Sequence, residues 1–388
     1  MYRLFYPRRD ATLYEKYPTK NTGIDQILEV SKIASGSPDS GIIGTNTYNT
    51  RILIDFGDEI TTISQARASG LIGNNAKYYL NLRATNSTNL PISYSLEVYA
   101  IGEQWVNGTG TDADIPITTN GASWQYRSSE NVGQTWTTAG TGDITGSNGM
   151  TNIGGGTWIK PNIDWGNTSW SALIGYATAS KQFNYESPDL RVDVTNIVNG
   201  WLGSKYPNYG FLVKRPDSDE RSGQPFGELK FFSKDTNTIY VPRLEVAWDT
   251  SNFSGTSSFT EISSDSYVIY FKNIRSAYRV GDKIKFRLGV RPQFPVKTYT
   301  TGSFYLSPNY RLPTSSYYSV LDTVTNETII PYDTTASKIS CDSNGNYIDL
   351  QLDTFQPERY YKLALRVERD SGNDIQLHDD GYYFKVVR

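Results

Sequence analysis

The sequence predicts an all-β protein built from two β-sandwiches, the first with one short helix and the second immunoglobulin-like. Three observations predict this. Apolar and polar residues alternate with a period of two in most segments, as in residues 227–232. Tyr occurs 29 times and Gly 33 times, and these residues favour strands and turns respectively. A helical period is confined to one short segment.

The first half of the chain contains the first set of expected strands. A strand is expected to begin almost at Met1, and the clearest others lie at residues 51–56, 78–83, 94–99, 227–232 and 243–248. The expected helix follows from apolar residues at spacings of three and four, namely Val194, Ile197, Val198, Trp201 and Leu202. Asp193 or Thr195 is expected to cap this helix, and Gly203 to end it.

The second half begins after a change in composition. Residues 250–258 are polar and predict a linker, which gives a first domain at 1–249 and a second at 259–388. The second domain is expected to hold strands at residues 267–271, 283–290, 317–322, 328–332, 347–352, 361–367 and 382–387. Asn344-Gly345 is a strong hairpin signal, and residues 325–327 are a weaker one. About seven strands in a segment of this length are typical of an immunoglobulin-like sandwich.

Composition argues against several classes of protein. Charged residues make up 20% of the chain and the net charge is −3, so no basic field for nucleic acid is expected. No apolar run approaches the roughly 20 residues that span a bilayer, so no membrane insertion is expected. The N-terminal residues lack the apolar core of a signal peptide, so we expect the protein to fold in a cytosol. Cys341 is the only cysteine, and therefore no intrachain disulfide can form.

The sequence offers little for catalysis, and we expect a protein that is not an enzyme. His378 is the only histidine and is expected in a solvated turn before the last strand, while Cys341 is expected to pack rather than react. One Cys and one His cannot form a tetrahedral zinc site. No cofactor is expected, with structural calcium left open at Asp55 and Asp58 or at Asp112 and Asp114. A hydrolase with an unmarked pair of carboxylates is the third and weakest interpretation.

Tryptophans give the candidate contact residues. Trp158, Trp165 and Trp170 lie in a segment rich in Gly, Asn and Thr, where an exposed ring could stack on a sugar or contact a partner. A core role is the competing interpretation, and it fits Trp105, Trp124, Trp201 and Trp248 best. Residues 214–221 carry six charged side chains in eight positions and are interpreted as a solvated loop.

Residues 5–248 resemble the DNRLRE family, a jelly-roll sandwich similar in shape to carbohydrate-binding modules. The resemblance rests on short pieces in the family's order, at residues 10–14, 21–23, 51–56, 105–110, 121–127, 135–140, 193–201 and 242–244. The family's core strand ends in Phe-Asp, whereas residues 51–56 end in the reversed order, Asp55-Phe56. The resemblance implies a fold but no single function, because members occur in surface proteins, sugar-active enzymes and phage virions.

The layout of the whole chain resembles a structural protein of a tailed bacteriophage. A jelly roll without a signal, followed by an immunoglobulin-like tail, implies assembly in the host cytoplasm into a virion, as a decoration, neck, tail or baseplate component. The implied partners are other virion proteins and copies of the chain itself, and a host surface glycan is a further candidate. The alternative function is a carbohydrate-binding module of a surface or sugar-active protein.

Overall fold

The computed structural model describes most of the chain and confirms an all-β, sandwich-type fold. The described residues are 1–34, 47–129, 133–136, 154–159, 177–254, 256–294, 309–369 and 372–388. They form two compact units. Unit 1 comprises Met1–Leu4, Ile72–Ala76 and Val246–Arg388, and unit 2 comprises Phe5–Leu71 and Lys77–Glu245.

Unit 2 contains most of the strands of the first half of the chain. They are β2 (Arg9–Tyr14), β3 (Ile27–Ala34), β4 (Thr47–Asp55), β5 (Lys77–Leu82), β6 (Ala84–Thr88), β7 (Ser93–Ala100), β8 (Tyr126–Ser128), β9 (Gln134–Thr135), β10 (Thr178–Asn184), β11 (Leu190–Asp193), β12 (Phe211–Lys214) and β13 (Gly227–Phe232). The division between units falls within β1 (Tyr2–Phe5) and β14 (Arg243–Ala247). All the strands expected in this half are present, so the period-two pattern was a sound guide.

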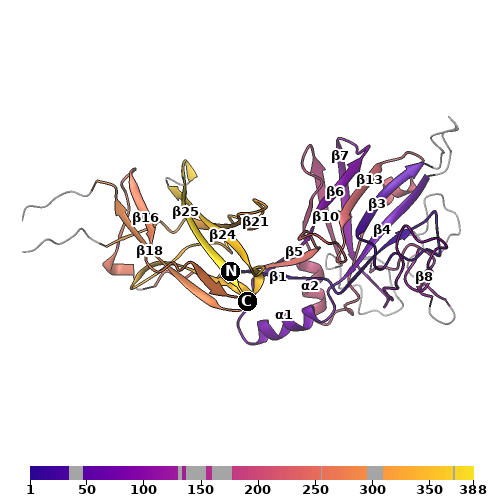
Figure 1. The fold of residues 1–388 in the computed structure, drawn as a ribbon, viewed down its shortest axis with the longest axis horizontal. Coiled ribbons are helices and arrows are strands. Elements are labelled where there is room, and N and C mark those ends of the chain that lie inside the picture. The colour runs from indigo at the N-terminus through magenta and orange to yellow at the C-terminus, as the bar shows by residue number, and fades with distance from the viewer. Residues whose placement is uncertain are drawn as a thin grey trace, which may run out of the picture. The chain divides into compact units, whose positions relative to one another are not determined.

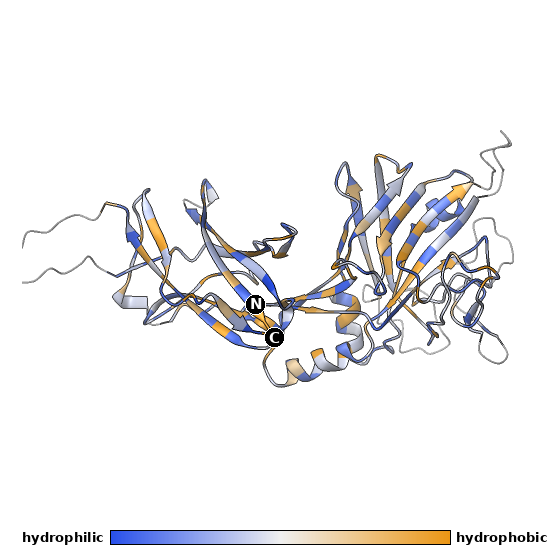
Figure 2. Cartoon of the chain, in the orientation of Figure 1, coloured by the Kyte–Doolittle hydropathy of each residue, from blue (hydrophilic) through white to orange (hydrophobic). Residues whose placement is uncertain are grey.

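An eight-stranded sheet is the largest element of unit 2 (Figure 1). Its strand order is β10-β7-β12-β4-β3-β13-β6, and β2 pairs with β4 beside this path. A four-stranded sheet has the order β1-β14-β5-β11, and β8 and β9 form a short ribbon. Alternation along the strands is visible in Figure 2, and in β13 every second residue is buried.

Three α-helices occur in the described residues, where one was expected. The expected helix is α2 (Thr195–Leu202), which ends at Gly203 as predicted. The Asp193 carboxylate accepts a hydrogen bond from the Thr195 amide at 2.9 Å, whereas the Thr195 hydroxyl accepts one from Tyr78 of β5. The two helices that were not predicted are α1 (Glu59–Ala68) and α3 (Asp217–Arg221).

Tryptophans dominate one core cluster of unit 2. Trp105, Trp124, Trp136 and Trp158 are each at most 2% exposed and pack with small and aliphatic residues of β2, β4 and β12. Trp201 of α2 is also buried and contacts Phe211 of β12, with ring centroids 4.7 Å apart. This tryptophan-rich cluster forms the apolar side of the site described below.

Unit 1 contains two further sheets built from the second half of the chain. A six-stranded sheet has the order β15-β19-β18-β23-β22 with β16 paired to β18, and a five-stranded sheet has the order β17-β25-β24-β20-β21. The strands are β15 (Thr260–Glu261), β16 (Tyr267–Phe271), β17 (Ala277–Arg279), β18 (Lys283–Pro292), β19 (Tyr310–Arg311), β20 (Ser316–Asp322), β21 (Thr328–Ile330), β22 (Ser340–Asp342), β23 (Gly345–Gln351), β24 (Arg359–Arg369) and β25 (Asp374–Val387). Two 3₁₀ turns, Thr256–Ser258 and Leu352–Thr354, complete the unit.

Both expected hairpins occur in unit 1. Ser343 and Asn344 connect β22 to β23, and Gly345, the first residue of β23, has a φ of 105°, a conformation that favours glycine. Asn326, with a φ of 56°, lies between β20 and β21. The segment expected as a linker also belongs to unit 1. Within it, the Asn252 carbonyl and the Ser254 amide hydrogen bond to the backbone of Cys341 in β22.

Candidate functional site

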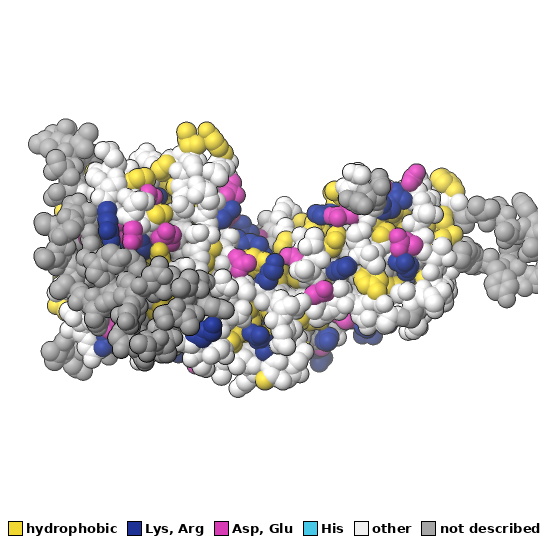
Figure 3. Space-filling model, turned by 180° about the vertical axis from the view of Figure 1, so that it is seen from behind, with side chains coloured by type: hydrophobic (Ala, Val, Ile, Leu, Met, Phe, Trp, Pro, Cys, Tyr) yellow, Lys and Arg dark blue, Asp and Glu magenta, His cyan; other side chains and the backbone are white. Residues whose placement is uncertain are grey.

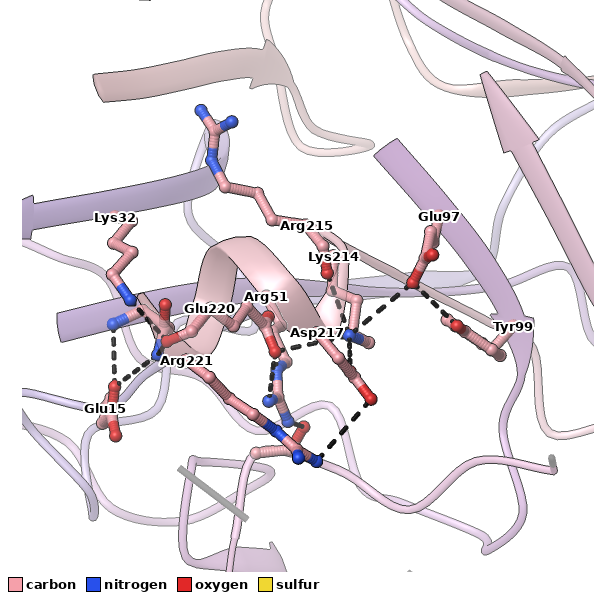
Figure 4. A network of polar contacts seen from close by, with 12 residues as sticks. Glu15, Lys32, Arg51, Glu97, Tyr99, Lys214, Arg215, Asp217, Glu220 and Arg221 are labelled. Carbon is pink, nitrogen blue, oxygen red and sulfur yellow. Dashed lines mark hydrogen bonds and ion pairs between the residues drawn. The ribbon is translucent and has the colours of Figure 1, made fainter. Parts of the chain in front are cut away.

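The most concentrated group of ionisable side chains in the described residues lies inside unit 2, around α3 (Figure 4). We call it the α3 network and define it as Glu15, Lys32, Arg51, Glu97, Lys214, Asp217 and Glu220. Lys214 ends β12, and Pro216 follows within two residues and leads into the short helix. The helix therefore returns Glu220 toward β4, where Arg51 lies.

Arg51 and Glu220 form a bidentate ion pair. Nε of Arg51 donates to Oε1 of Glu220 at 2.9 Å, and Nη2 donates to Oε2 at 2.7 Å. The two side chains are 1% and 4% exposed. A parallel pair of hydrogen bonds between a guanidinium and a carboxylate is the strongest arrangement that these groups form. Glu220 is thus fixed by an arginine that lies 169 positions earlier in the chain.

The rest of the Arg51 guanidinium is enclosed by backbone and aromatic rings. Nη1 donates to the carbonyl of Gly155 at 2.7 Å. The rings of Trp124 and Trp158 lie 4.7 and 5.0 Å from the guanidinium carbon, within the range of a cation–π interaction. Gly155 has a φ of 79°, and a Cβ there would collide with Nη1 and with the Trp124 ring. Only glycine fits at this position without strain.

Lys214 supplies the second buried cation of the network and is 0% exposed. Its ammonium donates to the carbonyl of Arg215 at 2.9 Å and to the Asp217 carboxylate, and lies 3.4 Å from Oε2 of Glu220. Glu97 of β7 lies 3.8 Å away and accepts a hydrogen bond from Tyr99. Lys214 and Arg51 therefore share Glu220, and Asp217 balances the second cation.

The far side of α3 is held through its backbone. Lys32 of β3 is buried and donates to the carbonyl of Glu220, which also receives the amide of Asn49 at 3.4 Å. Glu15 accepts the backbone and side-chain N–H groups of Asn49 at 2.8 and 2.9 Å. The helix is thus attached to β3 and β4 by its main chain as well as by its side chains.

Titration behaviour in the network follows from burial and pairing. Burial alone would raise the pKa of Glu220, but Arg51 and Lys214 outweigh it and hold the pKa below its usual value. Glu15 has weaker cation support, and burial raises its pKa. Burial lowers the pKa of Lys32 and raises the pKa of Tyr99, the latter with help from Glu97. Glu220 is therefore ionised and already bonded, which makes it a poor general acid or base.

Arg215 is the exception to full pairing. Its side chain is 1% exposed, and Nη2 donates to the carbonyl of Phe226 at 2.7 Å. Within the described part of the chain, Nε and Nη1 have no hydrogen-bond partner. Burial lowers the pKa of Arg215 to about 10. Figure 4 shows its guanidinium pointing away from the α3 network.

The interpretation of residues 214–221 as a solvated loop is wrong. The segment forms the end of β12 and all of α3, and Lys214, Arg215 and Glu220 are buried. The many charged residues of this segment are typical of a surface loop. A single sequence does not show that Arg51 lies opposite Glu220. The signal that could have revealed the pair is Arg51 itself, a cation in a strand whose other residues are largely apolar.

The structure corrects one of the three candidate contact tryptophans. Trp158 is 0% exposed, and its backbone pairs with Ile101 in an isolated bridge. Its ring contacts the Arg51 guanidinium and the Lys214 ammonium, so it is not available to a glycan or partner. Trp165 and Trp170 lie outside the described residues. Trp105, Trp124, Trp201 and Trp248 are buried, at 0%, 2%, 6% and 1% exposure, in agreement with the core interpretation.

The lone histidine and the lone cysteine are both engaged within unit 1. His378 lies inside β25 rather than in a turn, is half-buried, and its Nε2 is 3.0 Å from the Tyr267 hydroxyl. The expectation of a solvated turn histidine is therefore wrong. Cys341 is 0% exposed in β22, and burial raises the pKa of its thiol, in agreement with a packing role.

The carboxylates considered for calcium contact other groups of the protein. Asp55 accepts Nε of Arg8 at 2.9 Å and of Arg9 at 2.8 Å, and Asp114 accepts the hydroxyls of Thr111 and Thr118. Asp112 pairs with Lys20, and Asp58 lies 4.0 Å from Arg8. The described residues contain no group of three or more His, Cys, Asp or Glu side chains suited to a metal ion. No helix among them is long and apolar enough to cross a membrane.

Comparison with known proteins adds little. No family model matches the chain, and no curated protein matches it. A solved structure of a DUF4785 family protein from Legionella pneumophila is 9% identical, with a TM-score of 0.20. That alignment covers 98% of this chain and 65% of the other, and at such a score it supports no argument. The resemblance to the DNRLRE family therefore stays a prediction.

Proposed function

We propose that this chain is a structural protein of a tailed-phage virion that works through protein–protein contacts and not through catalysis. The observation that carries the proposal is the state of the α3 network. Its central carboxylate, Glu220, is buried, ionised and bonded twice to Arg51, and the rings of Trp124 and Trp158 enclose that arginine. Such a network fixes α3 on β3 and β4, and its central carboxylate is not free to act as an acid or a base.

A rigid all-β scaffold suits a protein that must hold one shape in an assembly. Binding surfaces that are preorganised lose less entropy when a contact forms. The layout of two sandwiches and the DNRLRE-like pieces of the sequence support a virion as the setting. Cys341 is the only cysteine, so the fold depends on no intrachain disulfide and can form in a reducing cytoplasm. The partners in this proposal are other virion proteins and further copies of the chain.

The test is mass spectrometry of purified phage particles, followed by electron cryomicroscopy of the same particles. The proposal expects the chain at a fixed stoichiometry, in density that follows the symmetry of the particle. Absence of the chain from washed particles, with the protein left as a free monomer in the lysate, would overturn it.

Glycan binding remains the alternative proposal, now without Trp158 as a contact residue. A glycan array with the purified protein separates the two. Binding that is lost in the Trp165→Ala and Trp170→Ala variants, together with absence from particles, would favour a carbohydrate-binding module. Binding combined with incorporation would indicate a virion protein that also contacts the host surface.

A further inference from the structure

An amine, a carboxamide and a carboxyl group meet at one end of α3. Lys32 of β3 lies directly opposite Asn49 of β4 in the antiparallel register of these two strands. Glu15 directly follows β2, which also pairs with β4, and its backbone amide donates to the Asn49 carbonyl at 3.1 Å. Lys32 and Glu15 lie on the same side of α3 in Figure 4. Pairing to β4 therefore brings together three side chains that are distant from α3 in the sequence.

Hydrogen bonds hold these three side chains close to one another. The Lys32 ammonium and Nδ2 of Asn49 both donate to the carbonyl of Glu220. Two donors to one acceptor lie within roughly 6 Å of each other, and residues directly opposite on antiparallel strands have Cβ atoms about 4.5–5.5 Å apart. A change in the Lys32 rotamer therefore brings Nζ to the carboxamide carbon, Cγ, of Asn49. Oε2 of Glu15 lies 2.9 Å from Nδ2.

The Lys32 and Asn49 side chains are costly to bury as separate groups. Lys32 is 0% exposed and Asn49 is 1% exposed. Oδ1 of Asn49 is buried and has no hydrogen-bond partner within the described part of the chain. A buried amine and an amide oxygen without a donor both carry a desolvation penalty. A covalent bond between the two side chains would replace them with one neutral amide.

Burial also prepares the amine and the carboxyl group for reaction. It lowers the pKa of Lys32, although Glu220 and Glu15 oppose this shift, and it raises the pKa of Glu15. Both shifts favour the neutral forms, an amine with a free lone pair and a carboxyl group that carries a proton. A neutral amine is the nucleophilic form of lysine. The carboxyl group of Glu15 is placed at Nδ2, which is the leaving nitrogen of the Asn49 carboxamide.

We propose that Lys32 and Asn49 are joined by an isopeptide bond that forms within the folded chain. Nζ of Lys32 attacks Cγ of Asn49, so the Nζ–Cγ bond forms and the Cγ–Nδ2 bond breaks. Glu15 gives its proton to Nδ2 and receives one from Nζ, and one molecule of ammonia leaves. The exchange of one amide for another consumes no oxidant or reductant.

The bond would be a single event within one chain, so it goes beyond the proposed function and does not depend on it. It would join β3 to β4 covalently in a protein whose only cysteine is Cys341. The other buried lysine of the α3 network, Lys214, contacts the carboxylates of Asp217 and Glu220 and has no carboxamide among its hydrogen-bond partners in the described residues. The arrangement at Lys32 is therefore distinct within the network.

Mass spectrometry of the purified full chain, intact and after tryptic digestion, tests the bond. We expect a mass about 17 Da below that of the sequence, which is the loss of one ammonia. Trypsin cleaves after Lys and Arg, and residues 21–51 contain one internal site, at Lys32. Because a modified lysine is not cleaved, these residues should appear as one peptide that carries the whole mass loss. A chain of full mass that trypsin cleaves after Lys32 would overturn the proposal.

Three variants separate this bond from other losses of ammonia. Lys32→Arg removes the nucleophile and Glu15→Gln removes the proton carrier, so both variants should keep the full mass. Lys230→Arg in the neighbouring strand β13 is the matched control and should show the same loss as wild type. Succinimide formation at an Asn-Gly step, such as Asn107-Gly108, also releases ammonia. A loss that persists in Lys32→Arg would therefore overturn the proposal, and the wild-type peptide decides the question even if a variant misfolds.

Discussion

The two units each contain an arginine–carboxylate pair of nearly the same geometry in very different surroundings. In unit 2, Arg51 and Glu220 bond at 2.9 and 2.7 Å and are 1% and 4% exposed. In unit 1, Arg287 and Asp342 bond at 2.6 and 2.8 Å and are both 22% exposed. Both pairs are bidentate, and the main differences are that Arg51 and Glu220 are shut off from water and that Glu220 is shared with Lys214.

Geometry alone does not determine how much an ion pair contributes to the free energy of unfolding. When one partner of an exposed pair is removed, water solvates the other, and such pairs contribute about 0–1 kcal/mol. When one partner of a buried pair is removed, a charge is left without solvent or partner, and the cost is about 3–5 kcal/mol. Substitutions at the buried groups of unit 2 should therefore cost more than a substitution in the exposed pair of unit 1.

The largest effect is expected from Glu220→Gln. This change leaves Arg51 and Lys214 buried with one carboxylate fewer, so the free energy of unfolding of unit 2 should fall by about 3–5 kcal/mol at pH 7. Urea unfolding followed by tryptophan fluorescence measures it, because Trp105, Trp124 and Trp158 lie in this unit. The pKa of Glu220 is lowered, so its contribution is present above the unfolded pKa of about 4.3 and is lost as the pH falls through the folded value. The gap between wild type and variant should therefore narrow only below about pH 4.

Asp10 provides a second test, because it is a buried carboxyl that, unlike Glu220, has no arginine partner. It is 1% exposed, accepts only the Lys234 amide among the described residues, and burial raises its pKa to about 7. A raised pKa contributes stability below the unfolded value of about 3.9, and this stability is lost as the pH rises through about 7. Relative to Asp10→Asn, wild type should lose up to about 4 kcal/mol between pH 4 and pH 8. Parallel stability profiles of the two proteins across this range would contradict the assignment.

Gly155→Ala tests how tightly the backbone and rings pack around Arg51, without altering a charge. The added Cβ meets Nη1 of Arg51 and lies 2.9 Å from the Trp124 ring, and the φ of 79° is unfavourable for alanine. We expect a loss of about 1–3 kcal/mol in the free energy of unfolding. Gly223→Ala is the matched control, because nothing lies within 4 Å of its added Cβ. Equal stability of the two variants would mean that the packing around Arg51 can accommodate an added methyl group.

The smallest effect is expected from Asp342→Asn, which breaks the exposed pair. Water reaches Arg287 on removal of its partner, so the loss should be about 0–1 kcal/mol and should shrink further in 1 M salt. Thermal unfolding with and without salt measures it. A loss as large as that of Glu220→Gln would remove the distinction between the two pairs.

Local patterns were enough to predict α2 and many of the strands, although β3, β6 and β10 were not among those expected. In β13 and β16 the predicted and observed boundaries coincide, because alternation along a half-buried strand is written in consecutive residues. α1 was missed since its sequence, with four β-branched residues in a row at residues 60–63, is a weak helix former. Its buried positions Ile60, Ile63 and Ala66 are recognisable only once the neighbouring helix α2 is placed.

The α3 network could not be predicted, because it depends on contacts between distant parts of the chain. Residues 214–221 have the composition of a solvated loop, and their burial follows from Arg51 and Lys32 on neighbouring strands. Trp158 shows the same limit. A ring in a Gly-rich segment resembles a free binding face until the cations that cover it are placed.

A double-mutant cycle with Arg51→Met, Glu220→Leu and the double variant measures whether Arg51 and Glu220 act as one structural unit. We expect each single change to cost several kcal/mol, and the double variant to be more stable than the sum of the singles implies by about 2–3 kcal/mol. This is expected because two apolar side chains can replace a buried pair but not half of one. Costs that add within about 0.5 kcal/mol would show that Arg51 and Glu220 contribute independently.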